Sequence, residues 1–226
     1  MRPINKGAAP RVYREYGDAQ LDLISTIGKF CSYCERRITT SIAVEHKKPK
    51  DPYPQFRLDW ANFLLACPNC NSTKSDQKIK LSRYFWPDTD NTFCVFEYTP
   101  EGFVKPRRSL PRWARRKARR TLALFGLDRY PNHRHRPHRS TNKDSRWNDR
   151  RNQWEKAISM RDTLAELDTP RMRECIIINA RDGNFSIWME VFKDDIDMCQ
   201  RLIAAFPGTA SDCFDAHGRS FPYPGR

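Results

Sequence analysis

Two Cys-x-x-Cys pairs constrain this chain more than any other feature of its sequence. Cys31 is paired with Cys34 and Cys67 with Cys70, and residues 35–66 lie between the two pairs. Zinc takes four ligands tetrahedrally, and a two-residue spacer lets both sulfurs of one pair face the same ion. A disulfide or a redox pair is the other interpretation, but a redox site needs only one pair. The spacing therefore predicts a structural Zn²⁺ site that would contribute folding free energy directly.

The other four cysteines have no comparable spacing. The chain starts without an apolar stretch behind its first positive charge, and it has no apolar run of about 18 residues that would span a membrane. We therefore expect a cytoplasmic protein, in a compartment where disulfides are disfavoured. The unpaired cysteines are then expected to be small core residues: Cys94, Cys175, Cys199 and Cys213.

The balance of charge indicates a polyanionic partner. The chain has 226 residues, with 41 Lys and Arg against 27 Asp and Glu, which gives a formal net charge of +14. Hydrophobic residues make up 38% of it, enough for one large domain or two small ones. Nucleic acid is the first candidate partner and an anionic membrane surface the second, and we favour nucleic acid with no membrane partner. The sequence holds no Gly-x-x-x-x-Gly-Lys-Ser/Thr loop, so any ATP dependence would come from another protein.

Helix and strand patterns alternate with the cysteine pairs in the first part of the chain. We expect a polar arm, a short helix, two short strands separated by a proline-rich loop, and a second helix. The arm covers residues 1–17, the first helix 18–29, the two strands 42–44 and 63–66, and the loop 47–57, and the second helix begins at Asn71. The two strands could pair as a hairpin. The order of cysteine pair, strand, loop, strand, cysteine pair and helix predicts an α+β module within residues 1–104.

A basic and mainly helical region is expected over residues 105–226. Pro111 and Gly126 are typical of the start and the end of a helix over 112–125. The aromatic-rich segment before it is expected to be mostly extended, and three more helices and a loop are expected after it. These are the extended segment 82–104 with Phe93–Phe96, the loop 129–145, and helices over 146–167, from Pro170 to near Gly183, and over 195–205.

Three groups of side chains in the second half could bind ligands or partners. The arginines of the predicted basic helix are expected to lie along a phosphate backbone, with a solvated basic face as the alternative. Large apolar residues could dock a partner, although such residues more often form a core. Three histidines could bind a metal, although a flexible basic loop is favoured. The arginines are Arg115, Arg116, Arg119 and Arg120. The apolar residues are Trp147, Trp154, Trp188, Met189 and Phe192, and the histidines are His133, His135 and His138.

Four polar residues near the cysteine pairs suit phosphodiester hydrolysis. Glu45 and His46 follow the first predicted strand, Asn62 precedes the second, and Asn71 follows the second cysteine pair. Imidazole has a pKa of about 6.5, so much of it is neutral at pH 7 and can accept the proton of an attacking water. Carboxylate and amide oxygens can hold a hard cation such as Mg²⁺, which would neutralise the charge that develops on the phosphate.

Residues 31–76 resemble the signature of the HNH nucleases in their cysteine pairs, acidic–His pair, middle Asn and final Asn-x-x-Lys. The resemblance implies a zinc-stabilised ββα-metal module that acts as a metal-dependent endonuclease. It implies that His46 is the general base and that Glu45 and Asn71 hold the catalytic metal. Asn62 would brace the loop and orient His46, and Lys74 would contact the phosphate backbone. The chain departs from the signature where Glu45 replaces the usual Asp and Asn71 the final His, and both departures keep an oxygen ligand.

A closer resemblance touches both halves of the chain. Seven segments are similar to the HNH nuclease subunit of retron-associated and Septu-type bacterial anti-phage systems: Arg2–Gly7, Tyr16–Asp18, Cys31–Arg36, Leu58–Leu65, Cys70–Lys74, Leu124–Arg129 and Ala205–Thr209. The resemblance implies a defence effector that works with an ATPase of the ABC or SMC-like type. It also brings in a retron reverse transcriptase and its DNA product as candidate partners. DNA is favoured as the substrate, and RNA, including tRNA, stays open.

Two other classes of function fit parts of the sequence. A zinc-stabilised nucleic-acid-binding module without catalysis would need the charge and the four cysteines, but not Glu45, His46, Asn62 and Asn71 together. A subunit whose main role is to complete an ATPase complex is the third interpretation. If substitution of Glu45 and His46 abolishes cutting but leaves DNA binding normal, the binding module is excluded. Failure to co-elute with an ATPase would count against the assembly subunit.

Overall fold

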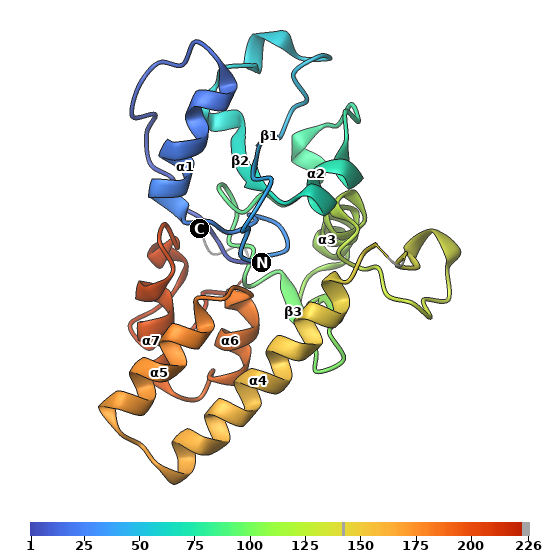
Figure 1. Ribbon diagram of the computed structural model, residues 1–226. Coiled ribbons are helices and arrows are strands. Elements are labelled where there is room, and N and C mark those ends of the chain that lie inside the picture. Colours follow the sequence, from blue (N-terminus) through green and yellow to red (C-terminus); the bar gives the residue numbers. More distant parts are fainter. Residues whose placement is uncertain (142, 223–226) are drawn as a thin grey trace.

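The computed structural model describes residues 1–141 and 143–222 as two packed parts joined along the N-terminal end of α4 (Figure 1). The first part holds α1, α2, α3 and four short strands, and the second holds α4 to α7. The helices are α1 (Ala19–Ile27), α2 (Pro68–Lys74), α3 (Arg112–Phe125), α4 (Arg146–Glu166), α5 (Pro170–Ala180), α6 (Phe185–Val191) and α7 (Ile196–Ala205). The strands are β1 (Ala43–His46), β2 (Phe63–Ala66), β3 (Phe96–Tyr98) and β4 (Val104–Pro106).

The two strands between the cysteine pairs form the predicted antiparallel pair. β1 pairs with β2 in a register that places His46 opposite Phe63. β1 extends two residues beyond the predicted end, so Glu45 and His46 belong to the strand itself. All four residues of β2 are buried, which accounts for its unbroken apolar sequence. The result places the acidic–His pair at the end of a strand that is fixed from one side by the core.

The helix after the second cysteine pair begins earlier than predicted. α2 starts at Pro68, one residue after Cys67, and not at Asn71. Proline is favoured at the first helical position, because its fixed φ suits the helix and its missing N–H would be unpaired there. Cys70 therefore lies in the first turn of α2, and Asn71 and Lys74 follow along the same helix.

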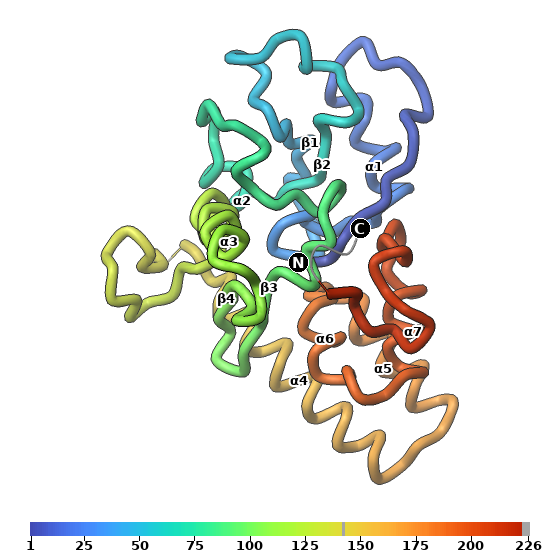
Figure 2. Tube along the Cα trace, turned by 180° about the vertical axis from the view of Figure 1, so that it is seen from behind, coloured from blue at the N-terminus to red at the C-terminus, as the bar shows by residue number. Residues whose placement is uncertain are grey.

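Each part has its own hydrophobic core. The first core surrounds the cysteine pairs and includes residues from α1, β1, β2 and α3. The second core is built from α4 to α7, together with Phe30 and Phe93 from the first part. Trp154 packs against both cores. Figure 2 shows α3 beside α2, with which it packs, so α3 belongs by its contacts to the first part. The division of the chain into domains at residue 104 stays a prediction.

Glu35 of the first part forms hydrogen bonds with Ser186 of the second part. Its buried carboxylate accepts hydrogen bonds from the backbone N–H and the hydroxyl of Ser186, at 2.8 and 2.7 Å, and lies 3.2 Å from the N-terminal amine of Met1. Gly183 comes equally close, because a Cβ there would lie 2.7 Å from the Glu35 carbonyl oxygen. Its φ of 116° also favours glycine. The start of α6 is thus packed directly against the first cysteine pair.

Most of the predicted helices of the second half are confirmed, and one helix was missed. α3 has the predicted bounds, and Gly126 ends it in the left-handed conformation with φ of 62°. α6 was not predicted because six of its seven residues are buried, so its sequence has no polar face. Trp188, Met189 and Phe192 are buried in the second core, so the docking interpretation is wrong for them. Residues 93–95 form a turn where extended backbone was predicted.

The cysteines outside the pairs divide into two kinds. Cys94, Cys199 and Cys213 are buried, as predicted, whereas Cys175 on α5 is exposed and the prediction is wrong there. Cys175 lies on the side of α5 that faces away from the second core, which explains its exposure.

Among the described helices, no segment combines the length and the apolar composition that a bilayer crossing needs.

Candidate active site and cysteine cluster

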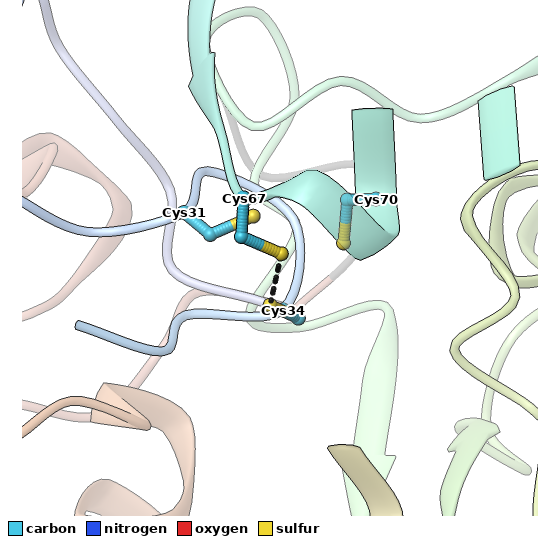
Figure 3. Close-up of side chains that lie close together, drawn as sticks. All are labelled: Cys31, Cys34, Cys67 and Cys70. Carbon is cyan, nitrogen blue, oxygen red and sulfur yellow. Dashed lines mark hydrogen bonds between the residues drawn. The ribbon is translucent and has the colours of Figure 1, made fainter. Parts of the chain in front are cut away.

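The four paired cysteines meet in one buried cluster, which we call the cysteine cluster. Cys31 and Cys34 come from the turn before β1, Cys67 from the end of β2 and Cys70 from α2 (Figure 3). Their sulfur atoms all lie within 4.8 Å of one another, and Cys34 Sγ is 3.6 Å from Cys67 Sγ. That separation is too long for a disulfide, whose sulfurs lie about 2.05 Å apart. The geometry is that of a four-sulfur metal site.

The four thiols of the cluster could hold a cation. Burial raises the pKa of the Cys31 and Cys70 thiols well above the ordinary value, whereas hydrogen bonds, first of all with Cys31, lower the pKa of the Cys34 and Cys67 thiols. A bound metal ion deprotonates the thiols that coordinate it. The four residues therefore fit a tetrahedral ion with thiolate ligands, as the sequence spacing predicts.

Two arginines contact the sulfurs from outside the cluster. Arg146, at the start of α4, donates to Cys70 Sγ at 3.1 Å and to the Phe125 carbonyl at 2.7 Å, and Asp144 holds its guanidinium with two bonds of 2.7 Å. Arg36 reaches Cys67 Sγ at 3.9 Å. Neither arginine was predicted. Arg36 follows the first pair by two residues, a sequence signal that could have found it, whereas no local signal marks Arg146.

A second site, open to solvent, lies at the end of β1. It is a pocket of about 320 Å³ lined by Glu45 and His46 of β1, Asn71 and Lys74 of α2, and Tyr16 and Lys50 from the segments around it. We call it the Glu45–His46 pocket. Four of the five polar residues predicted around the reaction thus lie together, although Glu45 and Lys74 are 29 positions apart in the sequence.

Glu45 is almost fully buried and is bonded through both carboxylate oxygens. Its Oε1 is 2.5 Å from the Lys74 ammonium, and its Oε2 accepts a hydrogen bond from the Tyr33 hydroxyl. Burial raises the pKa of Tyr33 well above its ordinary value, so the hydroxyl keeps its proton and donates it. Because Tyr33 lies between Cys31 and Cys34, the first cysteine pair positions the Glu45 carboxylate directly.

His46 presents one nitrogen as an acceptor. Its Nε2 lies 2.9 Å from the Arg57 carbonyl oxygen, which can only accept, so Nε2 carries the proton and Nδ1 is left with its lone pair. Burial lowers the pKa of His46 below its ordinary value, which keeps the imidazole neutral at pH 7. The ring is held by edge contacts with Tyr16 and Phe63, at 5.0 and 5.1 Å between ring centroids.

Asn62 lies behind the pocket and holds the loop that follows His46. Its Oδ1 accepts from the Lys48 backbone N–H at 2.7 Å, and its Nδ2 donates to the Lys48 carbonyl at 2.9 Å and the Phe56 carbonyl at 3.1 Å. Phe56 immediately precedes Arg57, whose carbonyl fixes the His46 ring. The side-chain hydrogen bonds of Asn62 thus go to the backbone of this loop, through which it acts on His46.

The remaining predicted residues differ in exposure. Asn71 is exposed at the pocket wall, whereas Lys74 is 1% exposed, and its ammonium also donates to the His46 carbonyl at 2.6 Å. The Lys74 ammonium is thus bonded to the Glu45 carboxylate and the His46 carbonyl and does not project toward solvent. The four α3 arginines predicted to contact nucleic acid are half-buried or exposed; Arg115, Arg119 and Arg120 line a different hollow, and Arg116 does not line it.

Comparison with known proteins identifies the class. Residues 31–77, which contain both cysteine pairs and the Glu45–His46 pocket residues of β1 and α2, match the HNH endonuclease family. The chain thus contains an HNH endonuclease domain, a nuclease fold of mixed helices and small sheets, as the resemblance of the motifs predicted.

Two relatives place this domain in a biological context. The chain is 33% identical over 89 residues to the "Septu protein PtuB" of Bacillus thuringiensis, which covers 37% of this chain and 35% of the relative. It is 24% identical over 113 residues to the "Retron Vc95 putative HNH endonuclease" of Vibrio cholerae serotype O1 biovar El Tor, which covers 45% of this chain and 53% of the relative. The chain therefore spans about a third of the first relative and about half of the second.

Proposed function

We propose that this chain is a metal-dependent HNH endonuclease that hydrolyses phosphodiester bonds of nucleic acid, with DNA favoured over RNA. The observation that carries the proposal is the environment of His46. Its Nε2 is bonded to the Arg57 carbonyl, and the ring lines the same pocket as Glu45 and Asn71. A neutral imidazole with a free Nδ1 is suited to accept the proton of a water that attacks phosphorus. Asn62 keeps the ring in place by holding the loop behind it.

Glu45 and Asn71 would hold a divalent cation in this pocket. Carboxylate and amide oxygens are the ligands that Mg²⁺ prefers. A carboxylate offers about four lone-pair sites, so Glu45 keeps acceptor capacity beside its bonds to Tyr33 and Lys74. When bound, the cation would neutralise the charge that develops on the phosphate and the leaving oxygen. Lys74 and Tyr33 would keep the Glu45 carboxylate in one orientation.

We assign Zn²⁺ to the cysteine cluster as a structural ion. Four thiolates with no open position are typical of structural zinc, whereas catalytic zinc keeps a position for water or substrate. Arg146 and Arg36 contact two of the sulfurs and would offset part of the negative charge of the loaded site. The two ions thus have separate roles and separate ligand chemistry.

We further propose that the chain acts in anti-phage defence together with other proteins. The names of the two relatives support this context. The resemblance of the motifs implies an ATPase partner of the ABC or SMC-like type, with a retron reverse transcriptase and its DNA product as further candidates. Co-expression with a neighbouring ATPase followed by size-exclusion chromatography tests the first partner, because a chain that never co-elutes with it would contradict the proposal.

Cleavage assays with a matched pair of variants test the catalytic proposal. Zinc-loaded protein, alone and with the ATPase, is incubated with plasmid DNA and with total RNA, with and without Mg²⁺. His46→Ala is compared with His217→Ala, which removes an exposed imidazole that does not line the pocket. We expect Mg²⁺-dependent cutting that His46→Ala reduces by a factor of about 100 or more and that His217→Ala leaves unchanged.

The outcomes separate the three classes of function. Cutting that survives His46→Ala would refute the assigned base. Nucleic-acid binding without any cutting by the wild-type protein, with zinc present and the ATPase added, would support the zinc-stabilised binding module. Co-elution with the ATPase without binding or cutting would support the assembly subunit.

A further inference from the structure

A second hollow lies beside α3, and we call it the α3 groove. It has a volume of about 950 Å³ and is formed by α3, by β4 with the preceding Phe103, and by the segment from Asp128 to His138. It shares no lining residue with the Glu45–His46 pocket. Residues 129–141 project as a loop beside α3 in both views (Figures 1 and 2), and Tyr130, His133, Arg134, His135 and His138 of this loop line the groove.

The walls of the groove are strongly cationic. Six exposed or half-buried Lys and Arg side chains line it, namely Lys105, Arg108, Arg115, Arg119, Arg120 and Arg134, and the buried Arg150 lines it as well. Within the described residues, none of the six forms an ion pair with a carboxylate, whereas neighbouring Arg107 and Lys117 are paired with Glu190 and Asp90. The single carboxylate among the lining residues, Asp128, lies 2.7 Å from His138 Nδ1. The groove therefore has several uncompensated positive charges facing one cavity.

Aromatic rings lie among these charges. Phe103 and Tyr130 are half-buried, with ring centroids 4.3 Å apart, and His133 lies 4.7 Å from Tyr130. The loop that carries Tyr130 and His133 is folded back on itself, because the Tyr130 N–H donates to the His138 carbonyl and the Ser140 N–H donates to the Tyr130 carbonyl. The rings are thus held in place at the wall of the cavity and are not buried in either hydrophobic core.

Guanidinium groups bind phosphate oxygens through parallel hydrogen bonds, and aromatic rings bind bases by stacking. Paired bases in a duplex already stack on their neighbours, so only an unpaired base offers its face to a protein ring. We propose that the α3 groove binds a segment of single-stranded nucleic acid at a site separate from the Glu45–His46 pocket. The inference rests on the proposed function for the class of its ligand, nucleic acid, but not on catalysis.

The helix offers a matched pair of variants. Arg115 and Arg119 line the groove one turn apart, whereas Arg112 and Arg116 have the same spacing on the same helix and do not line it. The probe is a labelled mixed-sequence oligodeoxynucleotide of about 20 nucleotides, a length that exceeds the site size of typical single-strand binders. Its duplex serves as the comparison. Binding is measured by fluorescence anisotropy on zinc-loaded full-length chain that carries His46→Ala, so that no cutting occurs.

We expect the double variant Arg115→Gln/Arg119→Gln to weaken single-strand binding by about tenfold or more. The slope of log K against log salt concentration should fall by roughly 1.4, because two phosphate contacts are lost. Arg112→Gln/Arg116→Gln should change the affinity by less than about threefold, since these charges lie outside the groove. An equal loss from both pairs would overturn the proposal, because it would show a general effect of net charge.

Tyr130 tests the preference for single strands. Tyr130→Ala should weaken single-strand binding by about tenfold with little change in duplex binding, and Tyr130→Phe, which keeps the ring, should retain the affinity. If the duplex binds as tightly as the single strand and Tyr130→Ala changes neither, the proposal is overturned. Because binding is read without cleavage, a chain that binds as expected while wild-type protein never cuts would refute only the proposed function. Zinc content and circular dichroism confirm that each variant is folded.

Discussion

The cysteine cluster is closed and uniform, whereas the Glu45–His46 pocket is open and mixed. All four cysteines are buried, and their sulfurs face one another. The pocket combines a buried carboxylate, a buried imidazole and an exposed amide, and it opens to solvent. A structural ion requires a complete set of ligands, whereas a catalytic site must leave room for substrate and water.

The same chain segments nevertheless carry both sites. Tyr33, between two cluster cysteines, donates to Glu45. α2, which contains Cys70, also carries Asn71 and Lys74. β2, which ends before Cys67, holds the strand of Glu45 and His46 in register. From this difference we infer that the cysteine cluster is the frame that positions the residues of the open pocket.

The largest expected effect is loss of the frame. In Cys70→Ser the cluster keeps three sulfurs, and zinc binding, worth about 10 kcal/mol or more, is lost or greatly weakened. That loss is comparable with the whole stability of a typical domain, so the first part should unfold and cutting should disappear. Zinc content and thermal melting measure the effect. Cys175→Ser, at an exposed position of α5, is the control and should change stability by less than about 0.5 kcal/mol. A folded, zinc-free Cys70→Ser variant with normal cutting would break the comparison.

The second expected effect concerns the contact between the cluster and α4. Arg146→Ala removes the bonds to Cys70 and to two backbone carbonyls and leaves the Asp144 carboxylate without its partner. Truncating one member of a buried ion pair costs about 3–5 kcal/mol. Arg151→Ala, on the same helix but with an exposed ion pair to Glu155, should cost at most about 1 kcal/mol. Urea unfolding measures both variants, and equal losses would show that the Arg146 contacts are unimportant.

The smallest expected change in stability concerns the hydrogen bond from Tyr33 to Glu45, which links the two sites. Its loss should change activity selectively. Tyr33→Phe and Tyr98→Phe each remove a hydroxyl that donates to a buried carboxylate, Glu45 in one case and Glu35 in the other. Both should lower the free energy of unfolding by about 1 kcal/mol. Only Tyr33→Phe should lower the rate of cutting, by a factor of about 10, because the Glu45 carboxylate becomes less well oriented. Equal cutting by the two variants would separate the cluster from the pocket.

Spacing alone predicted the residues that act through a local pattern. The four cysteines needed only their positions, and α3 only Pro111, Gly126 and a repeating apolar stripe. The acidic–His pair and the two asparagines were predicted by their place between and after the cysteine pairs.

Contacts between distant segments were not predictable in the same way. The Arg57 carbonyl that fixes the His46 tautomer, the burial of Lys74 against Glu45 and the contact of Arg146 with Cys70 depend on how loops and helices pack. α6 was missed because burial on nearly every side removes the polar face that marks a helix in sequence.

The most direct test of the account is the Mg²⁺ dependence of cutting by Glu45→Gln, with zinc content measured on the same sample. This substitution keeps the shape of the side chain and removes the charge that would hold the divalent cation, while the cysteine cluster is untouched. We predict a variant that retains its zinc and loses Mg²⁺-dependent cutting by a factor of about 100 or more. A zinc-loaded Glu45→Gln variant that cuts at the wild-type rate and with the same Mg²⁺ dependence would contradict the account.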